Sequence, residues 1–180
     1  LKNVNQWLCW KYDERDGKQT KIPINPETYE NTSAPEAAWS YEVCRNAMPA
    51  GYRGYVGLGF SLRNGIVGID LDHVLDDAVQ LKPEYASLES IIDKIASYTE
   101  MSPSRTGLHI LFRCDDIPQE CKVGRKRKEN IEMYCEGRFF TVTGKVWKYP
   151  NELRNLSAEE YREIYSTLIG GPADPASSTK

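Results

Sequence analysis

Two aspartates interrupt an apolar segment at residues 66–74, which reads Ile-Val-Gly-Ile-Asp-Leu-Asp-His-Val. A short run of β-branched and apolar residues after an Asn-Gly turn signal predicts a strand. Alternation along a strand places Asp70 and Asp72 on one face, about 7 Å apart, where two negative charges repel unless a cation lies between them. Hard oxygen ligands suit Mg²⁺ or Mn²⁺. The alternative is a strand edge on which both aspartates are solvated.

A polar turn at residues 102–107 leads into an apolar strand expected over residues 108–114. The turn is rich in hydroxyls and contains an arginine, and a histidine follows near the start of the strand. Hydroxyls, backbone amides near a glycine, arginine and histidine together suit a polyphosphate. The expected phosphate ligands are Ser102, Ser104, Arg105, Thr106 and His109. The alternative for His109 is a structural histidine in the core.

Two more segments carry charges that suit the same chemistry. Glu132 lies inside an apolar strand expected over residues 130–135, with Tyr134 on the same face. Residues 122–128 hold five positive charges in seven positions, and phosphate is their natural partner. We expect this basic segment to bind a nucleic-acid backbone through Arg125, Lys126, Arg127 and Lys128. A solvated loop is the alternative.

The elements that must position these residues are short strands and amphipathic helices. A hairpin is expected from strands at residues 4–12 and 20–24, and the strand at 55–62 is expected to pair with the 66–74 strand through the turn at 63–65. A further strand begins at Arg138. Helices are predicted from near Pro35 to residue 47 with Thr32 or Ser33 as cap, over residues 83–98, and over residues 156–169 with Ser157 as cap.

Composition narrows the class of protein. The 180 residues are 40% hydrophobic with a net charge of −3, which is typical of a globular domain and excludes a uniformly basic nucleic-acid coat. Five widely spaced cysteines without a Cys-x-x-Cys motif argue against a disulfide framework or zinc ribbon. We expect a soluble, cytoplasmic protein without membrane association, cut from a longer chain, with residues 170–180 as a linker.

Three motifs in this order resemble the catalytic domain of the archaeo-eukaryotic primase superfamily, particularly the primase-polymerase domains of phage, plasmid and mobile-element replication proteins. The acid pair within residues 68–72, the small-residue turn ending in histidine at 102–109 and the lone acid within 131–134 carry the resemblance. Residues 137–144 also look like these members, and the resemblance spans residues 4–148. Arg105 is a departure, since glycine is common there in the family.

The resemblance implies an α+β fold with the archaeo-eukaryotic primase architecture, a small α/β module beside an RRM-like antiparallel sheet flanked by helices, over residues 1–169. It implies a template-directed nucleotidyltransferase, a DNA primase or DNA polymerase. Its substrates would be a single-stranded DNA template, a primer strand and dNTPs or rNTPs, with a helicase domain or protein as a further partner. Nucleotidyl transfer uses two metal ions that bridge the attacking and leaving oxygens. Asp70, Asp72 and Glu132 would hold Mg²⁺ or Mn²⁺, and Arg138 would add positive charge for the nucleotide.

Two other functions compete with this interpretation. A relaxase-type nuclease needs a His-hydrophobic-His metal pair and a tyrosine nucleophile, but the two histidines, His73 and His109, are 36 positions apart. A catalytically inactive RRM-like nucleic-acid-binding module would show exposed aromatic residues on central strands, rather than three acids on one face.

Overall fold

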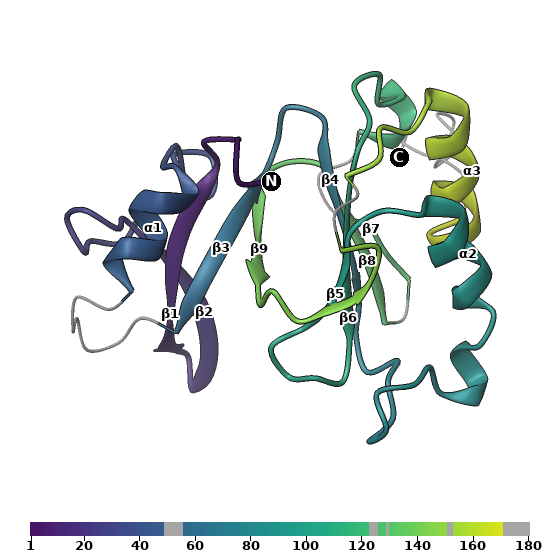
Figure 1. Ribbon diagram of the computed structural model, residues 1–180, viewed down its shortest axis with the longest axis horizontal. Coiled ribbons are helices and arrows are strands. Elements are labelled where there is room, and N and C mark those ends of the chain that lie inside the picture. Colours follow the sequence, from purple (N-terminus) through teal and green to yellow (C-terminus); the bar gives the residue numbers. More distant parts are fainter. Residues whose placement is uncertain (49–55, 123–125, 129, 151–152, 171–180) are drawn as a thin grey trace, which may run out of the picture.

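The computed structural model describes residues 1–48, 56–122, 126–128, 130–150 and 153–170 of the chain. In these ranges it is an α+β protein with two antiparallel sheets and three α-helices. The sheets stand next to each other, with α1 beside the first and α2 and α3 beside the second (Figure 1). In the described part of the chain, no helix is long and apolar enough to cross a membrane.

The first sheet has the strand order β2-β1-β3-β9. Its strands are β1 (Trp7–Arg15), β2 (Lys18–Ile24), β3 (Gly57–Leu62) and β9 (Arg138–Val142). The hairpin of β1 and β2 confirms the prediction for residues 4–24, with Asp16 and Gly17 at positive φ in its turn.

The second sheet has the order β10-β5-β6-β4-β8-β7. Its strands are β4 (Ile66–Leu71), β5 (Thr99–Met101), β6 (Leu108–Arg113), β7 (Lys126–Lys128), β8 (Ile131–Tyr134) and β10 (Val146–Lys148). Both faces of this sheet are covered. Residues such as Ile69 and Ile110 pack against α2 and α3, whereas Leu111 and Tyr134 pack toward the first sheet.

The predicted hairpin between β3 and β4 is wrong. These strands lie in different sheets, because the pairing sites of β3 are taken by β1 and β9, and those of β4 by β6 and β8. The tight turn at Asn64 and Gly65, both at positive φ, carries the chain from one sheet to the other. Gly68 allows the sheets to approach, since a Cβ there would lie 2.7 Å from the ring of Phe140.

The helices are shorter than predicted. Helix α1 (Tyr41–Ala47) begins after Ser40, which accepts from the Val43 N–H, and not near Pro35. The predicted cap residue Ser33 only closes a turn with Glu36. The intervening Trp39 forms a β-bridge with Trp7, which is incompatible with helical backbone.

The segment 83–98 holds two short helices in place of one. A 3₁₀ turn, η1 (Pro83–Tyr85), precedes α2 (Leu88–Ile95), which ends where Ala96 adopts a left-handed conformation. A second 3₁₀ turn, η2, spans Gln119–Cys121. The closing helix α3 (Ala158–Leu168) has the predicted capping box between Ser157 and Glu160.

Candidate active site

A row of charged residues crosses the second sheet at one level. Glu100 on β5 pairs with His109 on β6, His109 pairs with Asp70 on β4, and Asp70 pairs with Glu132 on β8. Residues directly opposite each other in antiparallel strands project from the same face of the sheet. These four side chains therefore share the face that is turned toward the first sheet.

Asp70 and His109, the two middle residues of the row, line a cleft between the two sheets, whereas Glu100 and Glu132 are not among the lining residues. One part, of about 510 Å³, is lined by Asp70, His109 and Tyr134 from the second sheet and by β2 and β9 residues from the first. The adjoining part, of about 270 Å³, is lined by Asp70, Asp72, Ser102, Ser104 and His109. The structure thus brings the acid pair, Ser102, Ser104 and His109 to one place, whereas Arg105 and Thr106 are not among the residues that line it.

Asp70 is the most constrained acid in the cleft. Its side chain is 25% exposed, yet its Oδ1 is buried and has no hydrogen-bond partner; His109 Nε2 is 3.6 Å away. Burial raises the pKa of Asp70, and the charges of Asp72 and Glu132 raise it further, while His109 and Lys21 oppose the rise. Such an oxygen costs about 1 to 3 kcal/mol unless something positive binds it.

His109 is buried and held on both edges. Its Nδ1 lies 3.0 Å from the carbonyl oxygen of Thr141, and its Nε2 faces Asp70. Because a carbonyl oxygen can only accept, Nδ1 carries the hydrogen and Nε2 is the nitrogen presented to the cleft. Phe140 packs against the ring, with centroids 4.9 Å apart.

The polar turn at residues 102–107, named the phosphate turn for its expected ligand, contains three hydroxyls within hydrogen-bond distance of one another in series. Ser102 Oγ lies 3.0 Å from Ser104 Oγ, which lies 2.9 Å from Thr106 Oγ1. Arg105 is exposed at the tip with a φ of +65°, the left-handed region that favours glycine.

Gly107 is required at the base of this turn by close packing. A Cβ on it would lie 2.5 Å from the Leu71 carbonyl oxygen and 3.2 Å from Ser102 Oγ. The glycine thus keeps the hydroxyls next to the acid-bearing strand.

Glu132 is tied to its own strand. The Tyr134 hydroxyl donates a hydrogen bond to Glu132 Oε2, as expected for two residues on one face. The guanidinium of Arg138 stands over the Tyr134 ring at 5.6 Å and lines the cleft. Arg138 therefore lies on the first sheet, facing the row of the second.

The donor set suits a hard divalent cation. Asp70, Asp72 and Glu132 offer carboxylate oxygens, and the unpartnered Oδ1 of Asp70 is the atom that most needs a cation. In the described ranges, no three His, Cys, Asp or Glu side chains converge into a ready metal site. Glu132 would have to share its carboxylate between Tyr134 and a bound ion.

Sequence reasoning passed over two residues of this site. Lys21, which looks like a solvated lysine at the edge of a strand when only the sequence is considered, is exposed on β2 but lines the cleft opposite the acid pair. Desolvation lowers its pKa, and the charges of Asp70 and Asp72 act in the opposite direction. Glu100 had no motif of its own; only its pairing with His109 reveals it.

The basic segment is only partly visible. Arg125 lies outside the described residues, and for Lys126, Arg127 and Lys128 the structure describes the backbone alone, as strand β7. This edge strand pairs with β8, so Arg127 stands opposite Glu132 in register. The predicted DNA contact stays a prediction.

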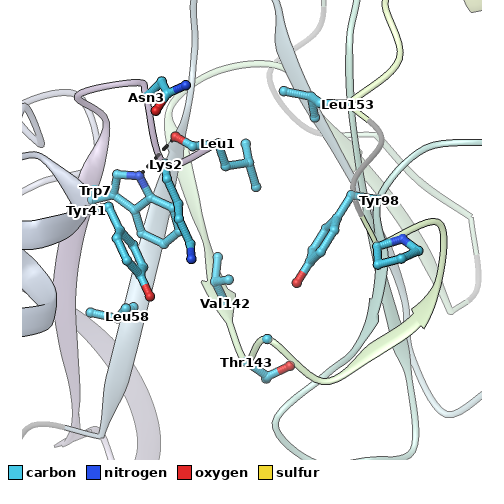
Figure 2. A pocket seen from close by; sticks show the side chains of 12 residues that line it. Leu1, Lys2, Asn3, Trp7, Tyr41, Leu58, Tyr98, Val142, Thr143 and Leu153 are labelled. Carbon is cyan, nitrogen blue, oxygen red and sulfur yellow. Dashed lines mark hydrogen bonds between the residues drawn. The ribbon is translucent and has the colours of Figure 1, made fainter.

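A second pocket, of about 640 Å³, lies between the sheets and is lined mainly by aromatic and aliphatic residues (Figure 2). Trp7, Tyr41 and Leu58 form one wall, and Tyr98 and Leu153 stand across from them. The Tyr98 hydroxyl donates to Glu100 Oε2 at 2.7 Å. Tyr98 therefore connects this pocket to the charged row, because it lines the pocket and bonds Glu100.

The fold and site together define an α+β protein with carboxylates, hydroxyls and a histidine in a cleft between two antiparallel sheets, an arrangement compatible with a primase-like fold. The chain is 37% identical over 161 residues to a DNA primase-polymerase of Nitratiruptor phage NrS-1. The alignment covers 87% of this chain and 21% of the relative, so the chain spans about a fifth of that protein. No family model matches the chain. The similarity supports a relationship to the primase-polymerases.

Proposed function

We propose that this chain is the catalytic domain of a DNA primase-polymerase of the archaeo-eukaryotic superfamily, a template-directed nucleotidyltransferase. The observation that carries the proposal is the in-register row of His109, Asp70 and Glu132. Asp72, Ser102 and Ser104 line the same cleft as Asp70 and His109. The similarity to a phage DNA primase-polymerase over most of the chain supports it.

Asp70, Asp72 and Glu132 would hold Mg²⁺ or Mn²⁺. Bound there, divalent cations would stabilise the charge on the attacking 3′-hydroxyl and on the leaving phosphate oxygens. The buried Oδ1 of Asp70 is suited to this role because it has no competing hydrogen-bond partner in the described structure.

The remaining cleft residues would bind the triphosphate and the nucleic acid. The hydroxyls of Ser102 and Ser104 line the cleft next to the acids and His109, and Lys21 faces them from the first sheet. These hydroxyls and Lys21 would donate to phosphate oxygens and orient the nucleotide for attack. His109 would join them as an imidazolium, the form in which Nε2 also carries a hydrogen. Arg105 and Thr106 would support the turn at its exposed side, and Arg138 would contact the nucleotide from β9. The basic segment at 125–128 would follow the template or primer backbone.

The test is primer extension and de novo primer synthesis on a single-stranded DNA template, with dNTPs or rNTPs and with Mg²⁺ or Mn²⁺. Incorporation should require a divalent cation, and Asp72→Asn or Glu132→Gln should lower it about 1,000-fold while the chain stays folded, since each removes several kcal/mol of charge stabilisation. Asp77→Asn, at an exposed position outside the cleft lining, is the matched control and should extend normally.

Normal extension by a folded Asp72→Asn variant would remove Asp72 from the site. Template binding without any incorporation under all four nucleotide and metal combinations would favour the inactive RRM-like binding module instead.

A further inference from the structure

Glu100 is a buried carboxylate that the proposed chemistry does not use directly. It is 1% exposed, yet three donors other than His109 satisfy it. Oε1 accepts from the Thr143 N–H at 2.9 Å, and Oε2 accepts from the Gly144 N–H at 2.8 Å and from the Tyr98 hydroxyl at 2.7 Å. Burial acts to raise the pKa of Glu100, but the neighbouring His109 and the hydrogen bonds from Tyr98 and Thr143 outweigh it and hold the pKa below its ordinary value. The residue is therefore an anion inside the protein.

Glu100 lies next to His109, on the side away from Asp70. Glu100 Oε1 is 3.7 Å from His109 Nδ1, and the two residues are paired across β5 and β6. The same carboxylate holds the backbone of residues 143 and 144, two positions after Thr141, whose carbonyl oxygen receives the Nδ1–H of His109. Glu100 thus contacts the histidine itself and also anchors the segment that carries the partner of the histidine.

We propose that Glu100 is a positioning residue for His109, which fixes the imidazole with Nδ1–H turned inward and Nε2 turned toward Asp70 and the cleft. The network begins at the pocket of Figure 2, where the Tyr98 hydroxyl points toward the side of Thr143, and it ends at Asp70. Its effect on nucleotide binding rests on the proposed function; its effect on the orientation of His109 does not.

Glu100→Gln separates this role from simple packing, because glutamine has the same shape. Both carboxylate oxygens accept a backbone N–H, one from Thr143 and one from Gly144. In either orientation, a glutamine amide places its NH₂ group against one of these donors, and an NH₂ group cannot accept. Residues 141–144 must then shift, and His109 loses its fixed partner.

The experiment compares wild type, Glu100→Gln and the exposed control Glu84→Gln in the 180-residue chain. Long-range ¹H–¹⁵N spectra report the histidine tautomers; the chain has two histidines, so His73→Gln assigns the His109 signals. We expect a single Nδ1–H tautomer for wild type and control, and a mixture for Glu100→Gln. Calorimetry with dATP and Mg²⁺ should show about 10-fold weaker binding for Glu100→Gln, the effect typical of removing the hydrogen-bond partner of a functional histidine.

A folded Glu100→Gln variant with the wild-type tautomer and unchanged dATP affinity would overturn the inference. If that variant does not fold, Tyr98→Phe takes its place, because it removes one hydrogen-bond donor to Glu100 and leaves the charge. Tyr98→Phe should weaken dATP binding about threefold. Unchanged affinity would again overturn the proposal. A wild-type chain that binds no dATP would contradict the proposed function, while the tautomer comparison would still test the role of Glu100.

Discussion

Replacing Asp70 with asparagine should stabilise the metal-free protein while removing its capacity for catalysis. Asp70 is held next to Glu132 in register, and its buried Oδ1 has no hydrogen-bond partner, so the ionised carboxylate is destabilised by burial and by like charge. An unsatisfied buried acceptor costs about 1 to 3 kcal/mol. Because asparagine carries no charge and can donate, Asp70→Asn should raise the free energy of unfolding by about 1 to 2 kcal/mol at pH 7.

The pH dependence follows from the direction of the shift. Since the folded-state pKa of Asp70 is raised, folding is penalised at pH values above that pKa, where the folded protein carries the buried charge. As the pH falls, the carboxyl is protonated first in the folded state, and the penalty disappears once the pH is below the unfolded-state pKa of about 3.9. The gain from Asp70→Asn should therefore be largest near neutral pH and absent at about pH 3.

Urea denaturation in EDTA measures this effect, with the same titration repeated in MgCl₂ or MnCl₂. The metal should raise the free energy of unfolding of wild type but not that of Asp70→Asn. The stability difference between the two proteins should therefore shrink or change sign in metal. Asp77→Asn, at an exposed position, should change stability by less than about 0.5 kcal/mol under all conditions. An Asp70→Asn variant that is less stable than wild type in EDTA at pH 7 would refute the reasoning.

Three further predictions concern neighbouring features. Lys21→Met should weaken dATP binding about fivefold, the effect of one partly exposed charge contact, whereas Lys18→Met on the same strand should not; equal affinities would return Lys21 to a solvated edge. Gly107→Ala should lower the free energy of unfolding by about 1 to 3 kcal/mol in thermal or urea denaturation, because its Cβ meets the Leu71 carbonyl at 2.5 Å; an unchanged midpoint would show that the turn can shift freely. Neutralising residues 125–128 should reduce the slope of log affinity for single-stranded DNA against log salt by about 3, and an unchanged slope would mean a solvated loop.

The sequence predicted structure best where neighbouring residues alone set the conformation. The strand that carries Asp70, the hydroxyl turn before His109 and the capping box at Ser157 each depend on residues within one segment. The strand predicted over residues 66–74 ends at Leu71, however, and Asp72 lies in the turn that follows. The predictions failed where the outcome depended on distant partners. Ser33 and Glu36 look like a helix cap, but Trp39 is paired with Trp7.

The Asn64-Gly65 turn illustrates the same limit for strands. It predicts a reversal of the chain but not whether the two strands it joins will pair, and here each strand pairs with others.

Residue types and their spacing were enough to select candidate residues for metal and phosphate, because spacing within a strand or turn sets which groups share a face. Only the tertiary structure decided that Glu100, His109, Asp70 and Glu132 form one row, since register between strands far apart in the chain is set by packing on both faces of the sheet. It also decided that Lys21 faces the acids, because that contact joins two sheets whose association depends on the whole core.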